Sequence, residues 1–192
     1  VQPQLADRAA RPHPHGRDLS DVVWGGDRFV AVGYSVTQWS LDAVTWEMAI
    51  HEGTHLNSVA WTGAAFVAVG DGGVILRSPD GASWSQVQGP TSANLTGIAW
   101  GGGELVMVSE DRQAFRSADG LAWDPLPIPA PQGALRGVVY ADGGFCIFGD
   151  AGTVIVGSGT SWAPLGGANH SYLHIESMAA LGGRYYLQVG GR

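Results

Sequence analysis

Lysine is absent from this 192-residue chain, which carries ten arginines against 17 aspartates and glutamates. The formal net charge of −7 argues against nucleic acid as a partner, because its phosphate backbone is bound by clustered basic side chains. No apolar run approaches the roughly 20 residues that a membrane-spanning helix needs. The sequence therefore predicts neither a nucleic-acid partner nor a membrane span.

Cysteine is also nearly absent. The single residue of this type, Cys146, lies in the apolar run Phe145–Phe148. One thiol cannot form an internal disulfide, so the redox state of the compartment cannot be inferred from it. We expect Cys146 to be a small buried hydrophobic residue.

Glycine and tryptophan, by contrast, are abundant, at 30 and eight residues, and 45% of the chain is apolar. Such a composition is typical of many short strands joined by tight turns around a full core. The organisation of the chain is repetitive. A similar pattern, an apolar stretch that ends in an aromatic or small residue, recurs roughly every 40 residues. These end residues are Trp24, Trp61, Trp100, Tyr140 and Ala180.

Each unit continues beyond that residue with a glycine-bearing turn and further short apolar runs. In the second unit these runs are Phe66–Gly70 and Val74–Arg77, followed by the turn Ser78–Ser83 and Trp84. Runs of this length fit strands and are too short for helices. Four strands in roughly 40 residues is the spacing of a β-propeller blade. In each turn, we expect Ser and Asp to bond local backbone N–H groups and Trp to pack between blades.

The turn pattern resembles the Asp-box (BNR-like) repeat of bacterial propellers, which include sialidases, sortilin-like receptors and photosystem II assembly factors. It recurs at residues 40–46, 78–84 and 117–123, one residue shorter than is usual in that family. The fourth unit keeps only Ser158–Trp162, and the fifth shows no clear box. The resemblance implies a propeller fold with structural Asp boxes, and it favours a secreted or periplasmic location.

We therefore predict an all-β fold, a five-bladed β-propeller with four-stranded blades in a single domain spanning residues 1–192. The fifth blade begins at the C-terminal part of the chain, and Val1 to about Arg11 would complete it and close the ring. Two alternatives are a piece of a longer array and a half-ring completed by a second chain. The expected blades are 19–50, 51–90, 91–130, 131–168, and 169–192 with 1–18.

The histidines suggest where chemistry could occur, because all of them fall in predicted connectors between blades. His55 and His174 directly precede equivalent inner-strand residues, Leu56 and Ile175. In a closed five-bladed ring the three connectors would be consecutive, and their imidazoles would gather at the mouth of the central channel. Such a cluster suits copper or zinc. The predicted ligands are His55, His174, His15, His51, His170 and His13.

Two other interpretations of the histidines remain open. Polar surface loops collect histidine without any function, and imidazole can also serve acid–base chemistry without a metal. If a metal binds, Asp18, Glu52 and Glu176 are candidates for orienting the rings. Residues 51–55 also spell the H-E-x-x-H string of zinc proteases, which requires a helix. We expect a loop between strands here, so the string does not predict a protease.

Other polar residues expected on the same face are candidates for contacting a ligand, or are simply solvated turns. They are Tyr34, Glu52, Glu110, Arg112 and Arg192, with Asp71, Asp111 and Asp150 nearby. A sialidase would need several arginines converging on a carboxylate, and these loops hold too few. Two function classes remain: a propeller that binds a transition metal and a small ligand, or a non-catalytic module that binds a protein or glycan.

Overall fold

The structure is a computed structural model that describes residues 18–165, 174–181 and 184–190. These residues form antiparallel sheets, with one turn of 3-10 helix, η1 (Asp71–Gly73). The prediction of an all-β chain is confirmed. The predicted strands of Val1–Arg11 lie outside the described residues, as do His13, His15, His170 and Arg192.

The sheets follow the order of the chain. The first, six-stranded sheet contains β1 (Leu19–Gly25), β2 (Arg28–Ser40), β3 (Glu47–Trp61), β4 (Phe66–Gly70), β5 (Ile75–Ser78) and β6 (Ser85–Val87). The second contains β7 (Leu95–Gly101), β8 (Glu104–Ser109), β9 (Ala114–Ser117) and β10 (Asp124–Pro125). The third contains β11 (Leu135–Ala141), β12 (Gly144–Gly149), β13 (Val154–Ser158) and β14 (Ser161–Pro164). The fourth is the hairpin of β15 (His174–Leu181) and β16 (Arg184–Gly190).

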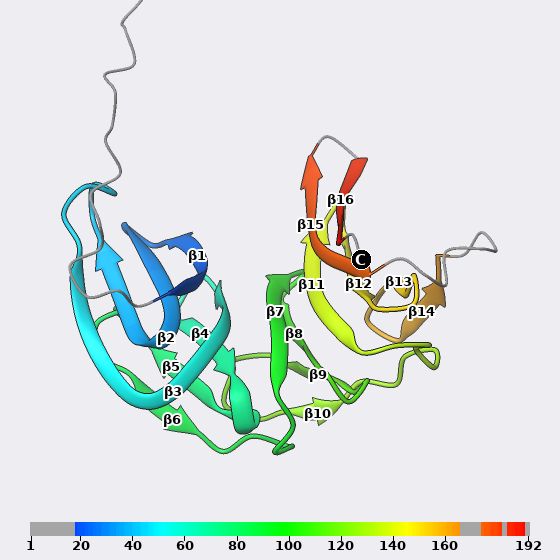
Figure 1. Cartoon of the computed structure of the whole chain (residues 1–192), viewed down its shortest axis with the longest axis horizontal. Helices are drawn as coiled ribbons and strands as arrows, with labels where there is room; N and C mark the ends of the chain where they lie inside the picture. Colours follow the sequence, from blue (N-terminus) through cyan, green and yellow to red (C-terminus); the bar gives the residue numbers. More distant parts are fainter. Residues whose placement is uncertain (1–17, 166–173, 182–183, 191–192) are drawn as a thin grey trace, which may run out of the picture.

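The sheets stand side by side in an arc (Figure 1). We number five successive groups of strands along it and call them blades 1 to 5; that the propeller has five blades stays a prediction. Blade 1 is β1, β2 and the start of β3; blade 2 is the rest of β3 with β4–β6; blades 3, 4 and 5 are the remaining sheets. The inner strands β1, β3, β7, β11 and β15 contact one another in that order. Among the described residues no strand ladder joins blade 5 to blade 1, so ring closure stays a prediction.

Blades 1 and 2 share a sheet because β3 changes partner along its length. Its residues Glu47–Ile50 pair with β2, whereas Leu56–Trp61 pair with β4. Gly53, with φ at 73°, lies between these two parts. The expectation that residues 51–55 form a loop was therefore wrong, because β3 continues through them, with a register shift in its pairing with β2 between Ile50 and His55. The expectation that they are not helical is confirmed.

The core lies between neighbouring blades. Phe66 of blade 2 packs with Val30 and Val32 of blade 1, and Phe145 of blade 4 packs with Val106 and Val108 of blade 3. Cys146 is buried between blades 4 and 5, and burial raises the pKa of its thiol to about 11. The prediction that Cys146 is a buried hydrophobic residue is confirmed.

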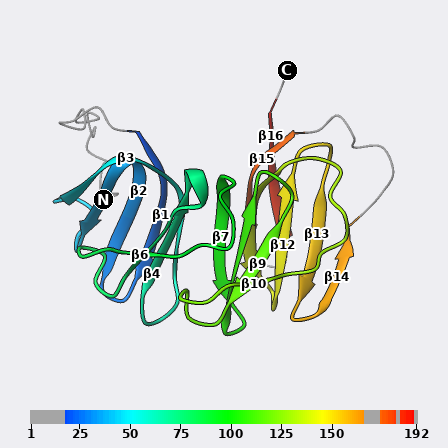
Figure 2. The same cartoon turned by 90° about the horizontal axis from the view of Figure 1, so that it is seen from below.

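Turns at one end of the arc are organised by aspartate side chains. Asp80 Oδ1 accepts hydrogen bonds from Ala82 N (2.9 Å) and Ser83 N (2.8 Å). Asp42 and Asp119 accept equivalent bonds from the turns that follow them. We call this end of the molecule the box end. The strands run between it and the opposite end, where η1 lies, which we call the η1 end (Figure 2).

Candidate functional site

The η1 end collects the residues that directly follow β4, β8 and β12, and the residue at the equivalent position within the longer strand β2. These residues are Asp71, Glu110, Asp150 and Tyr34. Three of them are anchored by backbone bonds to the residue before the inner strand: Tyr34 N to Asp18 O (2.9 Å), Glu110 N to Asn94 O (3.0 Å) and Asp150 N to Ala134 O (2.8 Å). Four polar side chains are thus presented at equivalent positions around the arc.

In three of the blades a glycine at the η1 end of the second strand lets that strand lie close to the start of the inner strand. A Cβ added at Gly33, Gly70 or Gly149 would overlap a backbone carbonyl oxygen at the start of the inner strand. The side chain that follows each glycine is therefore positioned by the sheet itself. Sheet-borne residues hold a binding geometry more firmly than residues on long loops.

His55, at the boundary between blades 1 and 2, contacts one residue from each. Its Nδ1 lies 3.3 Å from Asp71 Oδ2, and its ring meets that of Tyr34 edge to face at 5.7 Å. Asn57 Nδ2 donates to Asp71 Oδ1 at 2.9 Å, which fixes the carboxylate. The structure therefore brings together three residues that the sequence placed on this face: His55, Asp71 and Tyr34.

His174 has a similar arrangement between blades 4 and 5. Its Nδ1 lies 3.1 Å from Asp150 Oδ1. Arg136 also binds this carboxylate, through Nε at 3.0 Å and Nη2 at 2.7 Å. The Arg136 guanidinium is the main cause of the lowered pKa of Asp150, and His174 adds to the effect. The contact between His174 and Asp150 joins the two blades by a polar interaction as well as by apolar packing.

His51 and His55 contact different residues. Its Nε2 lies 3.0 Å from Thr37 Oγ1 on β2, and burial lowers the pKa of its imidazole. The carboxylates that orient His55 and His174 are Asp71 and Asp150, rather than the expected Asp18, Glu52 and Glu176. The sequence placed all five acids on one face, but it contained no signal for which would contact a ring.

Among the described residues, no three histidine, cysteine or acidic side chains converge as a metal site would require. Two inner strands, β7 and β11, also lie between β3, which carries His55, and β15, which carries His174. Along the described arc these histidines are therefore not neighbours. The predicted copper or zinc site depends on the ring closing between blades 5 and 1, and it stays a prediction.

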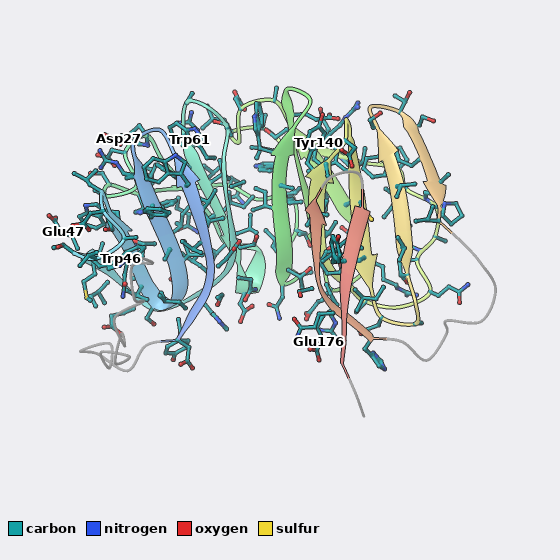
Figure 3. The ribbon with its side chains drawn as sticks, turned by 90° about the horizontal axis from the view of Figure 1, so that it is seen from above. Asp27, Trp46, Glu47, Trp61, Tyr140 and Glu176 are labelled. Atoms are coloured by element: carbon teal, nitrogen blue, oxygen red, sulfur yellow. The ribbon has the colours of Figure 1, made fainter. Side chains whose placement is uncertain are left out.

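Acidic side chains dominate the charge of the η1 end. Glu110 is exposed after β8, and Glu176 of β15 lies at the same end, opposite Asp27, Trp61 and Tyr140 (Figure 3). Arg112, with φ at 71°, lies in the turn that follows Glu110. The acids here are Asp18, Glu52, Asp71, Glu110, Asp111, Asp150 and Glu176, and the arginines are Arg112 and Arg136. The described part of this end therefore carries a net negative charge.

An open depression of about 740 Å³ lies at the same end, beside blades 2 and 3. It is lined by Gly72–Val74 of the η1 turn and by Gln86–Ser92, which are the end of β6 and the connector after it. Asn94 Oδ1 accepts a hydrogen bond from Gly72 N at 2.9 Å, which ties the turn to the start of blade 3. No pattern in the sequence predicted this depression, because its lining residues are far apart in the chain and carry no recognisable motif.

Comparison with known proteins identifies the class of fold. No protein-family model and no curated protein matches the chain. Solved structures do match, and they are β-propellers. Virginiamycin B lyase from Staphylococcus aureus superposes with a TM-score of 0.76 at 12% identity, over 93% of this chain and 65% of that protein. The fold is therefore that of a β-propeller.

The other matches include a propeller solved with a peptide. The protein YCF48 bound to D1 peptide has a TM-score of 0.71 at 22% identity, over 93% of this chain and 64% of that one. YCF48 from Cyanidioschyzon merolae has a TM-score of 0.71 at 15% identity, over 93% and 66%. The chain thus spans less than two thirds of these proteins. At such identities the likeness shows the fold alone.

Proposed function

We propose that this protein is a non-catalytic binding propeller that holds a basic peptide segment of a partner protein across its η1 end. The observation that carries the proposal is a set of four polar side chains at equivalent positions at one end of successive blades: Tyr34, Asp71, Glu110 and Asp150. A propeller of the same fold has been solved bound to a peptide, which supports this class of function.

Charge selects the kind of peptide. The η1 end has more carboxylates than guanidinium groups, and the whole chain has a net charge of −7. Glu110 is exposed, whereas Asp150 is already paired with Arg136. A peptide rich in arginine or lysine would be attracted to the exposed acids, and complementary charge speeds encounter and fixes register.

The depression beside η1 supplies room for the peptide backbone. Its lining includes Gly72, Gly73 and Gly89, so main-chain groups lie close to the surface there. Tyr34 is 56% exposed, and its ring contacts that of His55. The exposed ring can stack against an arginine side chain of the peptide. Backbone contacts would provide affinity, and the flanking acids and Tyr34 would provide selection for basic residues.

A pair of labelled peptides tests the proposal. Fluorescence anisotropy would be measured for a short peptide in which arginine alternates with serine, and for the same peptide with glutamate in place of arginine. We expect saturable binding of the basic peptide only, with affinity that falls as salt is raised because salt screens exposed charges. Equal binding of both peptides, or of neither, would contradict the proposal.

Matched variants locate the binding surface. Glu110→Gln should weaken binding of the basic peptide by about two- to fivefold, since an exposed ion pair contributes roughly 0.5–1 kcal/mol. Asp124→Asn removes one charge from an exposed residue that follows the box-end turn of the same blade, and it should leave affinity unchanged. If the two variants weaken binding equally, the peptide responds to overall charge and the proposed site is wrong.

A metal-binding function is the second candidate, and two similar contacts favour it. In both His55 and His174 the Nδ1 atom faces a carboxylate, at 3.3 and 3.1 Å. This is the arrangement by which proteins orient a histidine whose Nε2 binds a metal. Copper or zinc would then be held by Nε2 atoms, provided that both rings reach one ion.

A further inference from the structure

The outer strand of blade 2, β6, lies at the end of its sheet with one edge unpaired. Its residues Ser85–Val87 pair with Ile75–Arg77 of β5, and among the described residues no strand pairs with its other edge. β6 lies on the outer side of the arc, away from β1, β7 and β11 (Figure 1). An unpaired edge presents backbone N–H and C=O groups with which a further strand can pair.

In blades 3 and 4 the corresponding edge is blocked by proline. Leu126 N and Leu165 N donate, each at 2.8 Å, to carbonyl oxygens of β9 and β13. Because hydrogen bonding alternates along an antiparallel strand, the residue just before each leucine has its backbone groups facing off the sheet. These residues are Pro125 and Pro164, which have no N–H. Proline at such a position prevents a further strand from pairing there.

Blade 2 has glutamine at these positions. Gln86 lies two residues after the tryptophan of its box turn, as Pro125 and Pro164 do in their blades. Two residues further on, blade 2 has Gln88 where blade 3 has Pro127, and both glutamines are exposed. By the same alternation, the N–H groups of Gln86 and Gln88 face off the sheet. Blade 2 therefore keeps two donors on an edge that proline blocks in the next two blades.

The depression at the η1 end adjoins this edge. Residues 86–89 form part of its wall, and Gly72–Val74 form another part. Blade 1 also lacks proline at the equivalent position, where it has Met48, but none of its outer-strand residues, Glu47–Ile50, lines the depression. An unblocked edge and room for a further segment of chain therefore occur together at blade 2.

We propose that the basic peptide binds as an added β-strand along β6, with its backbone paired to Gln86 and Gln88 and its chain continuing into the depression. This inference rests on the proposed peptide-binding function and assigns the position and geometry of the backbone contacts. In strand addition the main-chain hydrogen bonds provide affinity whatever the peptide sequence. The carboxylates of the η1 end, such as Asp71 beside Gly72 of the depression, then select basic side chains.

A peptide fits this edge better than a second copy of the chain does. Pairing of β6 with β6 would join the three residues Ser85–Val87 of each copy, whereas a stable dimer buries roughly 1,000 Å² or more. An extended peptide is not limited to these residues, because it can follow the depression beyond the end of β6. Its backbone groups are also unpaired before it binds, so they can complete the open edge.

Two substitutions at one position of the full chain test the pairing with the alternating arginine–serine peptide. Gln86→Pro removes the outward N–H, and its ring obstructs an added strand, so it should weaken binding roughly tenfold or more. Gln86→Ala keeps the N–H and should bind within about twofold of the unaltered protein. Gln86→Pro is expected to fold, since Pro125 and Pro164 occupy equivalent positions, and circular dichroism checks that it does.

The outcomes separate this inference from the function on which it rests. If the unaltered protein binds the peptide and the two variants bind it equally well or equally poorly, the strand pairing is wrong and the proposed function stands. If the unaltered protein does not bind the peptide, both are wrong.

Hydrogen exchange followed by NMR tests the edge by a second measurement. In the free protein the amides of Gln86 and Gln88 should exchange faster than that of Val87, which pairs with β5, and the basic peptide should slow their exchange. Slow exchange at both positions before any peptide is added would show that the edge is already covered. Where that protection grows with protein concentration, a second copy is the occupant. Either result would overturn the proposal.

Discussion

At the scale of single residues, the box aspartates are held by backbone groups. The pKa of Asp80 is lowered chiefly by the N–H of Ser83, that of Asp42 by the N–H of Thr45, and that of Asp119 by the N–H of Leu121. The spacing of Ser and Asp in the sequence was enough to predict these local bonds, because both partners lie within a few residues. That their role is structural stays a prediction.

The lowered pKa values predict how stability depends on acid. A carboxyl whose pKa is lower in the folded than in the unfolded chain stabilises the fold above the unfolded pKa of about 4. This contribution is lost as pH falls through the folded pKa values. In the triple variant Asp42→Asn, Asp80→Asn, Asp119→Asn we therefore expect the free energy of unfolding to fall less steeply below about pH 4 than it does in the unaltered protein.

Urea unfolding at a series of pH values measures this effect. Asp124→Asn, on an exposed residue after the third box turn, is the control and should keep the original slope. A triple variant that loses stability in acid as steeply as the unaltered protein would show that these aspartates do not titrate with folding. The neutral Asn retains a side-chain oxygen that can accept hydrogen bonds, so gross misfolding is not expected.

At the scale of elements, the blades are joined by contacts between aromatic rings and glycine. The ring of Trp61 lies over Gly25, and that of Tyr140 over Gly101. The recurrence of these aromatics identified the repeat unit, and the apolar runs predicted its strands. The continuity of β3 could not be predicted, because it depends on strand pairing across two units rather than on local pattern.

The contact between Gly25 and Trp61 can be tested by adding one methyl group. Gly25→Ala should destabilise the protein by about 1–3 kcal/mol, because the Cβ would overlap the Trp61 ring. Gly144→Ala is a matched control, since its nearest neighbour outside the adjacent residues, Gly157 O, would lie 3.4 Å away. Thermal unfolding of both variants measures the difference.

A double variant separates the clash from any effect of alanine on the strand itself. In a Trp61→Ala background the additional cost of Gly25→Ala should fall sharply, because the ring that it meets is gone. An equal cost in both backgrounds would mean that the glycine is needed for another reason, and the proposed packing between blades 1 and 2 would then not explain it.

At the scale of the whole molecule, the arrangement of blades decides whether the histidines can act together. His55 and His174 are equivalent in their units, and each faces a carboxylate. Between their strands lie β7 and β11. One ion could bind both only if the arc closed on its other side, between blades 5 and 1, as the sequence repeat predicts for a closed ring.

Calorimetry with copper or zinc tests this arrangement on protein without a histidine tag. If one ion bridges both rings, His55→Ala and His174→Ala should each abolish stoichiometric binding, and binding should weaken as pH falls because protons compete for imidazole. If each single variant loses only part of the binding, the histidines act separately. In the absence of any tight binding the metal hypothesis is wrong, and the peptide-binding proposal is unaffected.

The sequence by itself determined the all-β class, the repeat unit, the aspartate turns and the face on which Tyr34, Asp71, Glu110 and Asp150 lie. These features follow from local spacing and from the alternating direction of antiparallel strands. Only the tertiary structure decided that Asp71 and Asp150 contact the histidines and that β3 joins two blades. Each of these features depends on how residues far apart in the chain are brought together. A repeat pattern predicts the strands of each blade, but it does not predict the angle between neighbouring blades.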